Sequence, residues 1–165
     1  MRMFTRVSAA LAAILSLSAA GASAQSANIN ATATVYQALT VTGARALDFG
    51  SVFPGVAKSI VVSDATSGRF DLSGQASANV NVSFTLPTNL TNGANNLPIG
   101  TWTGCTNATN TTAGCTSFTP SASATATALS GAGALFVWVG GTVSPAANQA
   151  AGSYTGTVTL TAAYF

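Results

Sequence analysis

The feature that most constrains the fold is an alternation of side-chain character over residues 153–165. One set of positions is apolar or aromatic: Tyr154, Val158, Leu160, Ala162 and Tyr164. The intervening set carries hydroxyl groups: Ser153, Thr155, Thr157, Thr159 and Thr161. Because side chains of a β-strand alternate between its two faces, this pattern predicts a half-buried strand. A sandwich that ends on such a strand either closes with it or leaves its edge open for another segment.

Strand-like segments recur along the chain, and no helical periodicity is found. The abundance of Thr, Val, Ala, Ser, Asn and Gly suits strands and turns. The strand candidates are residues 27–36, 38–42, 46–49, 57–63, 76–86, 134–140 and 153–165. Residues 87–133 are expected to be long loops with one or two short strands, near 99–103 and 121–128. This series of short strands predicts an all-β fold, an antiparallel β-sandwich of immunoglobulin-like type.

The first 24 residues have the pattern of a secretory signal peptide. Arg2 and Arg6 precede a mostly apolar stretch at residues 7–20, and Ala22-Ser23-Ala24 precedes Gln25. The apolar run is shorter than the roughly 20 residues of a membrane-spanning helix. We therefore expect cleavage after Ala24, export, and a mature chain with no transmembrane segment. Its parts would be an N-terminal strand or extension, residues 25–37, and a single domain, residues 38–165.

The charged residues of the mature chain are few and balanced. Its cations are Arg45, Lys58 and Arg69, and its anions are Asp48, Asp64 and Asp71. Such a chain cannot neutralise a run of phosphates, so we expect no nucleic-acid partner.

Residue types that catalysis or metal binding needs are scarce. The sequence contains no His and no Glu, so no Ser-His-Asp arrangement can be written. Two Cys without His do not make a zinc site. A glycosidase-like carboxylate pair could be drawn from Asp64 and Asp71, but we interpret both as turn residues. We expect no enzymatic activity, no metal and no cofactor.

Cys105 and Cys115 are the two cysteines of the chain. In an exported protein two cysteines most simply form one disulfide. Closing a loop of this size would stabilise the fold by about 3 kcal/mol in the chain-entropy model. We expect a staple of a polar surface loop, because neither the spacing nor the neighbours suit a redox-active pair.

Two segments resemble bacterial pilus proteins. Residues 46–55, Ala-Leu-Asp-Phe-Gly-Ser-Val-Phe-Pro-Gly, and the closing residues 151–165 resemble segments of chaperone–usher pilus subunits and of spore-coat-U-like and Mat-type fimbrial proteins. The mature chain also resembles a family of small secreted bacterial β-sandwich proteins described as a domain of unknown function. The matching segments are Ala33–Val35, Leu39–Thr42, Leu47–Gly50 and Val139–Val143. The best-known pilins link an early strand pair by their disulfide, whereas these cysteines lie mid-chain, so the pilus class stays open.

The resemblance implies a sandwich that lacks its last strand and is completed by a neighbour. The N-terminal extension of one subunit would add to the edge of the next subunit's last strand, in a head-to-tail contact that builds a filament. The implied donor residues are Ala27, Ile29, Ala31, Ala33 and Val35. The implied acceptor groove contains Tyr154, Val158, Leu160, Ala162 and Tyr164. The partners would be copies of the chain or related subunits, a periplasmic chaperone and an outer-membrane usher, and the location would be the periplasm and then the cell surface.

Two other function classes stay open at this point. In a self-contained secreted or surface sandwich, such as a coat or matrix component, residues 27–35 would simply be the first strand. In a carbohydrate-binding or adhesin module, an exposed Trp102 would offer a stacking face. Trp138 lies in the apolar run 134–139 and is predicted to be in the core.

Overall fold

The computed structural model describes residues 24–165, so the predicted signal peptide, apart from Ala24, lies outside the described residues. The chain divides after Thr34, and the unit that follows it is Val35–Phe165. None of the described residues belongs to a helix that is long and apolar enough to cross a membrane.

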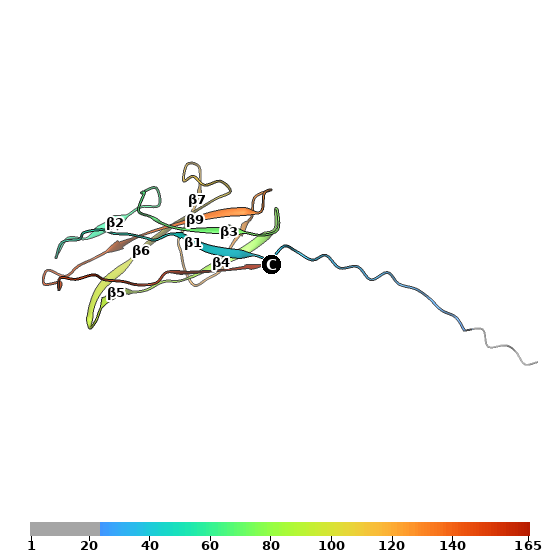
Figure 1. Cartoon of the computed structure of the whole chain (residues 1–165), viewed down its shortest axis with the longest axis horizontal. Helices are drawn as coiled ribbons and strands as arrows, with labels where there is room; N and C mark the ends of the chain where they lie inside the picture. The colour runs from blue at the N-terminus through green and yellow to red at the C-terminus, as the bar shows by residue number, and fades with distance from the viewer. Residues whose placement is uncertain (1–23) are drawn as a thin grey trace, which may run out of the picture. The chain divides into compact units, whose positions relative to one another are not determined.

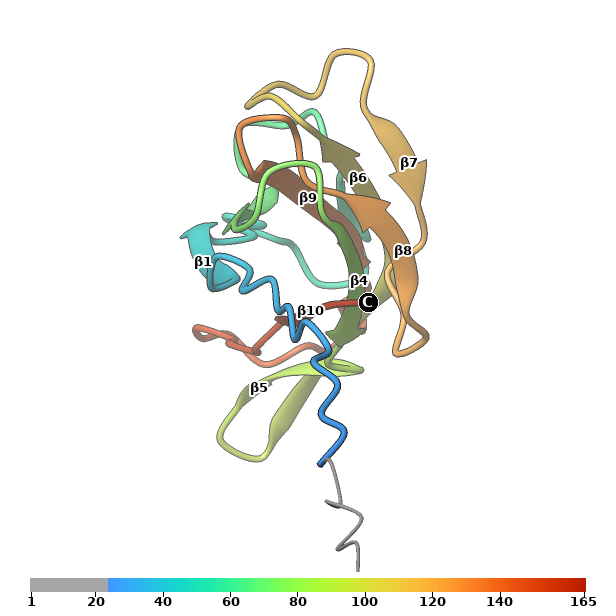
Figure 2. The same ribbon diagram turned by 90° about the vertical axis from the view of Figure 1, so that its right-hand side faces the viewer.

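Within residues 24–165 the structure has ten strands and no helix. They are β1 (Thr40–Arg45), β2 (Lys58–Ile60), β3 (Gly68–Ser73), β4 (Asn79–Thr85), β5 (Asn89–Asn92), β6 (Asn95–Asn107), β7 (Thr116–Phe118), β8 (Thr125–Ala128), β9 (Ala134–Val143) and β10 (Thr159–Tyr164). The first layer follows the order β1-β3-β9-β6-β5, with β2 also paired to β9 and β7 to β6 (Figure 1). The second layer is β10-β4-β8, in which β8 lies beside β4 (Figure 2). All pairings are antiparallel, which confirms the predicted β-sandwich.

The core forms where alternating apolar residues of the two layers meet. Val82 of β4 and Val137 of β9 are almost completely buried, and Leu160 of β10 joins them. A second cluster contains Phe49, Ile60, Leu97, Ile99 and Val143. Removing a large apolar side chain from water stabilises a fold by about 1.5–3 kcal/mol. The two clusters therefore hold the layers together over the length of the sandwich.

Three of the predicted strands are wrong in whole or in part: one near each end of the described chain, and one in the Leu-Asp-Phe-Gly segment. Residues 27–36 and 46–49 form no strand, and the strand predicted over 153–165 begins only at Thr159. Alternation alone cannot supply a hydrogen-bonding partner. Of residues 153–158, only Thr155 makes a ladder contact, an isolated bridge with Thr91.

The region expected to be mostly loop, residues 87–133, contains the four strands β5 to β8. β6 spans 13 residues, but a register shift between Gly100 and Thr103 interrupts its alternation. Thr101 has a positive φ of 47° at this bulge. The bulge hides the strand pattern in the sequence, and it turns Trp102 inward against both core clusters. Trp102 therefore does not offer the exposed stacking face that a carbohydrate-binding module would use.

β3 was not predicted because two charged residues interrupt its apolar pattern. Arg69 and Asp71 lie on its outward face and form an ion pair at 2.8 Å. Asp71 is therefore a strand residue and not a turn residue. Asp64 does occupy a turn, where its carboxylate accepts a hydrogen bond from the Val61 amide at 2.9 Å.

The predicted disulfide between Cys105 and Cys115 is present, with a Cα–Cα distance of 5.8 Å. It is more deeply placed than a surface staple, because Cys105 is completely buried in β6 opposite Trp138 of β9. Trp138 is buried as expected. However, it alternates with the core residues Val137 and Val139, so it lies on the outer side of the first layer, beside Phe136.

Candidate functional site: an open seam between the layers

The candidate site is the seam between β1, the outermost strand of the first layer, and β10, the outermost strand of the second. β1 pairs with β3 and β10 pairs with β4, and within residues 24–165 neither has a second ladder partner. The start of β1 lies near the end of β10, since the Tyr164 hydroxyl bonds to the backbone oxygen of Gln37. The end of β1 lies near the start of β10, since Arg45 and Val158 line one groove. The two edges therefore run in opposite directions.

A groove of about 1060 Å³ opens at the end of the seam where β1 ends and β10 begins. Its walls come from residues 43–54 and residues 149–158, and its apolar lining includes Phe70, Leu90, Leu97, Ile99, Val139 and Val143. Several of these residues belong to the two core clusters. The groove thus reaches the interior of the sandwich between two strand edges. Such a site suits an extended peptide, whose backbone pairs with an edge while alternate side chains enter the core.

Val41 shows that this side of the sandwich is uncovered. In the register of β1 and β3 it lies opposite Leu72, and opposite residues of an antiparallel pair share a face. Leu72 is 2% exposed, whereas Val41 is 37% exposed. An edge strand with an uncovered inward-facing apolar residue is a template for pairing with another segment.

The predicted acceptor residues are distributed along the whole seam. Tyr154 and Val158 line the groove. Leu160 is buried in the main core, and Ala162 and Tyr164 pack against that core further along β10. The structure therefore brings the first two to the groove and places the other three beyond it.

Hydrogen bonds fix both tyrosines of the seam. The Tyr154 hydroxyl donates to the Ala150 backbone oxygen at 2.8 Å and accepts from Gln149 Nε2 at 2.7 Å. The Tyr164 hydroxyl donates to the Gln37 oxygen at 2.8 Å and accepts from the Gln75 amide at 2.7 Å.

The predicted donor residues Ala27, Ile29, Ala31, Ala33 and Val35 lie in a segment without regular secondary structure, and all of them are exposed. The side chains of Ile29 and Val35 are 93% and 92% exposed. In the single chain, neither of these two large apolar side chains contributes to the core clusters.

Sequence reasoning missed the role of residues 46–52 as the wall opposite Tyr154 and Val158. Phe49 is buried in the second core cluster and Leu47 packs against it. The Asp48 carboxylate accepts a hydrogen bond from the Gly50 amide at 2.7 Å, and Gly50 has a φ of 56°, which favours glycine. The alternation of Leu47 and Phe49 was the available signal, but it indicated a strand instead of an irregular wall.

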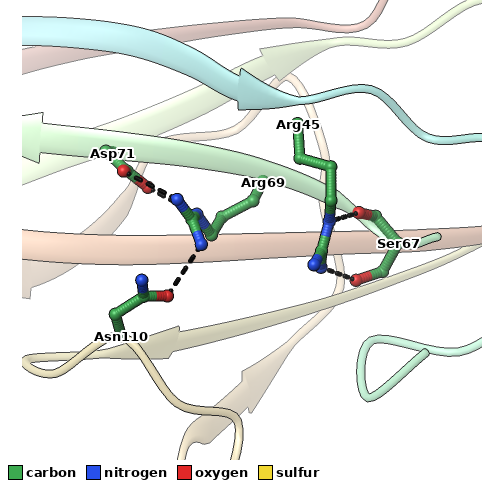
Figure 3. Close-up of polar contacts among 5 residues, drawn as sticks. All are labelled: Arg45, Ser67, Arg69, Asp71 and Asn110. Atoms are coloured by element: carbon green, nitrogen blue, oxygen red, sulfur yellow. Dashed lines mark hydrogen bonds and ion pairs between the residues drawn. The ribbon is translucent and has the colours of Figure 1, made fainter. Parts of the chain in front are cut away.

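A polar cluster on the first layer positions this wall. Arg45 donates from Nε and Nη2 to the backbone oxygen and hydroxyl of Ser67, at 2.6 and 2.7 Å (Figure 3). Arg69 bonds to Asp71 and, at 2.8 Å, to Asn110 of the disulfide loop. Both guanidinium groups are thus engaged by the protein itself. We interpret the cluster as structural, because it ties the end of β1 and the disulfide loop to the segment around β3.

We compared the chain with known protein families and with curated proteins. A family model described as "Domain of unknown function (DUF4402)" matches residues 19–164. No curated protein matches the chain.

Proposed function

The chain belongs to the DUF4402 family, and from its open seam we propose that it is a structural subunit of a bacterial surface fibre, assembled by exchange of N-terminal strands. The observation that carries the proposal is that one chain has both an open apolar groove and an exposed apolar segment that could occupy such a groove. A groove of about 1060 Å³ reaches the core beside the edge of β10, and the same chain has an exposed apolar segment at Ile29 and Val35. In the proposed fibre, each subunit's segment fills the next subunit's groove after export.

The chemistry of the two parts is compatible. Residues 25–36 contain no Asp, Glu, Lys or Arg, so their burial desolvates no ion. Ile29 and Val35 would each contribute about 1.5–3 kcal/mol on burial. The backbone of the segment would pair with the edge of β10, which the described chain leaves without a second partner. Together these terms favour a long-lived subunit contact.

The reach of the extension also fits. The extension leaves the sandwich at Gln37, whose amide bonds to Gln75 Oε1 at 3.3 Å and whose oxygen bonds to Tyr164. A strand rises about 3.3 Å per residue, so residues 25–36 span about 40 Å when extended, whereas the β10 edge spans about 20 Å. The extension is long enough to leave its own subunit and cover the edge of another.

The test uses exported, mature protein. Strand-exchanged subunits should run as a ladder of oligomers in SDS without heating and as a monomer after boiling. If exported protein is monomeric in both samples over a wide concentration range, and its surface fraction contains no oligomers, the fibre proposal is wrong.

One observation favours a second candidate, a self-contained coat or matrix protein. The core clusters and their packing partners start at Leu39, so the sandwich buries both clusters without any residue of the extension. In this case the protein should remain a monomer, and removal of residues 25–36 should leave its thermal stability unchanged. The carbohydrate-binding alternative loses its main support, because Trp102 packs against the core.

A further inference from the structure

We infer that neighbouring subunits also meet end to end, through Phe53 and Val56 of the accepting subunit and Tyr36 and Phe165 of the donating subunit. This inference rests on the proposed function. We call the first surface the turn pole and define it by Phe53–Val56 with Ala146 and Ala147. We call the second surface the C-terminal pole and define it by Tyr36, Gln75, Tyr164 and Phe165.

The two poles lie at opposite ends of the seam. At the turn pole, the Val56 amide donates to Phe53 O at 3.1 Å and the Gly55 amide to Ala146 O at 3.0 Å. This turn follows directly on the groove wall, which includes Val52 and Pro54. At the C-terminal pole, Tyr164 bonds to Gln37 and Gln75. Figure 1 shows the loop before β2 and the C-terminus at opposite ends of the sandwich.

The direction of the donor strand decides which poles meet. The extension leaves its own subunit at the C-terminal pole, beside the end of β10. If the extension added parallel to the neighbour's β10, the body of the donating subunit would face the neighbour's C-terminal pole. Two such subunits could exchange extensions reciprocally, which gives a closed dimer. Antiparallel addition instead places the donating body at the turn pole and leaves both outer poles free, so the contact repeats as a filament. A fibre therefore brings a turn pole against a C-terminal pole.

Both poles present apolar side chains that the single sandwich leaves uncovered. Phe53 is 71% exposed and Val56 57%, while Phe165 is 66% and Tyr36 56% exposed. The Tyr36 ring packs edge-on against Tyr164, with ring centroids 5.7 Å apart.

The distribution of exposed apolar residues supports the same contact. The large exposed apolar side chains of the described residues lie in the extension (Ile29 and Val35), on the seam (Val41), at the two poles, or at Val61. The C-terminal pole and its neighbouring turns, residues 74–77 and 130–133, contain no Asp, Glu, Lys or Arg. End-to-end contact would therefore cover apolar surface without burying a charged side chain of the C-terminal pole.

Disulfide trapping in the full chain tests the contact. One variant carries Phe53→Cys with Phe165→Cys, and a second carries Val56→Cys with Tyr36→Cys. After oxidation and blocking of free thiols, we expect oligomers that survive boiling without reductant and collapse to monomers with reductant. The matched control replaces Phe53→Cys by Ala126→Cys, because Ala126 is exposed on β8, level with Ala163 at the end of β10 and therefore far from the turn pole. The control should form only the heat-sensitive ladder.

The outcomes separate this inference from the proposed function. A heat-sensitive ladder without reducible cross-links in either pair overturns the pole contact and leaves the fibre intact. Reducible dimers in the Phe165→Cys single variant indicate that two C-terminal poles meet, which also overturns it. Absence of any ladder, in the parent chain as in the variants, contradicts the fibre itself.

Discussion

The Tyr164 hydroxyl donates a hydrogen bond to the backbone oxygen of Gln37 at 2.8 Å and so joins the end of β10 to the residue at which the N-terminal extension begins. The same hydroxyl accepts from the Gln75 amide at 2.7 Å. This relationship fixes the root of the extension at one end of the seam, whereas the groove opens at the other end. A segment rooted in this way has a defined direction, on which the proposed assembly depends.

Ile29→Asp should abolish oligomers while the sandwich still folds. The substitution would place an unpaired carboxylate in the neighbour's apolar groove, at a cost of several kcal/mol. In the single chain Ile29 is 93% exposed, so the fold itself should not change. Unheated SDS gels and circular dichroism measure the two effects.

Asn30→Asp is the matched control for Ile29→Asp, because it adds the same charge on the opposite face of the donor segment. It should keep the ladder. If both variants lost the ladder, the loss would be due to a negative charge anywhere in the segment and not to the position of Ile29. Unfolding of a monomeric protein by Ile29→Asp would show that residues 27–35 support the fold of their own chain, and would contradict the donor role.

A self-complemented chain should be a stable monomer. Residues 25–36 are removed from the N-terminus and appended after Phe165 through a short flexible linker, which allows them to return antiparallel along β10. The linker makes the contact intramolecular, with an effective concentration of about millimolar. Thermal unfolding and size-exclusion chromatography should show a higher Tm than that of residues 37–165 alone, and no oligomers.

The control for this chain carries Asp at the appended positions that correspond to Ile29 and Val35. It should unfold at the same temperature as residues 37–165 alone. An equal Tm for the apolar and the charged versions would mean that the groove does not receive this segment.

Tyr164→Phe should lower stability by about 0.5–1.5 kcal/mol, because it removes the hydrogen bonds to the Gln75 amide and the Gln37 oxygen while the ring still packs. Tyr36→Phe is the control, since no hydrogen bond of its hydroxyl is found within the described residues. Urea unfolding of both variants compares the two effects. Equal free energies of unfolding would show that the hydroxyl of Tyr164 contributes nothing.

The double substitution Cys105→Ala with Cys115→Ala should cost about 3 kcal/mol in the chain-entropy model and leave the β-sandwich intact. The bridge closes a local loop between β6 and β7, so the other strand pairings do not depend on it. Far-UV circular dichroism and thermal unfolding provide the measurement. A chain without β signal at room temperature would show that the buried Cys105 contributes more than loop closure.

The all-β class and the better strands could be predicted from the sequence because their signal is local. In β4 and β10 the alternation places Val82 and Leu160 inward and Thr159 and Thr161 outward, as the structure confirms. The disulfide was also predictable, since only two cysteines are present.

Other parts of the fold depend on partners far away in the chain. Arg69 and Asp71 interrupt the apolar pattern of β3, so the sequence does not predict this strand. In the structure the two side chains form an ion pair on its outer face. Trp102 faces the core because of the bulge at Thr101, which no local pattern indicates. The groove is the clearest case: its lining joins residues 43–54 to residues 149–158. The sequence by itself determined which segments can alternate as strands, because side-chain direction follows from the local backbone. Only the tertiary structure decided that β1 and β10 are outermost strands facing one seam, because an edge is defined by which distant strands pair and which do not.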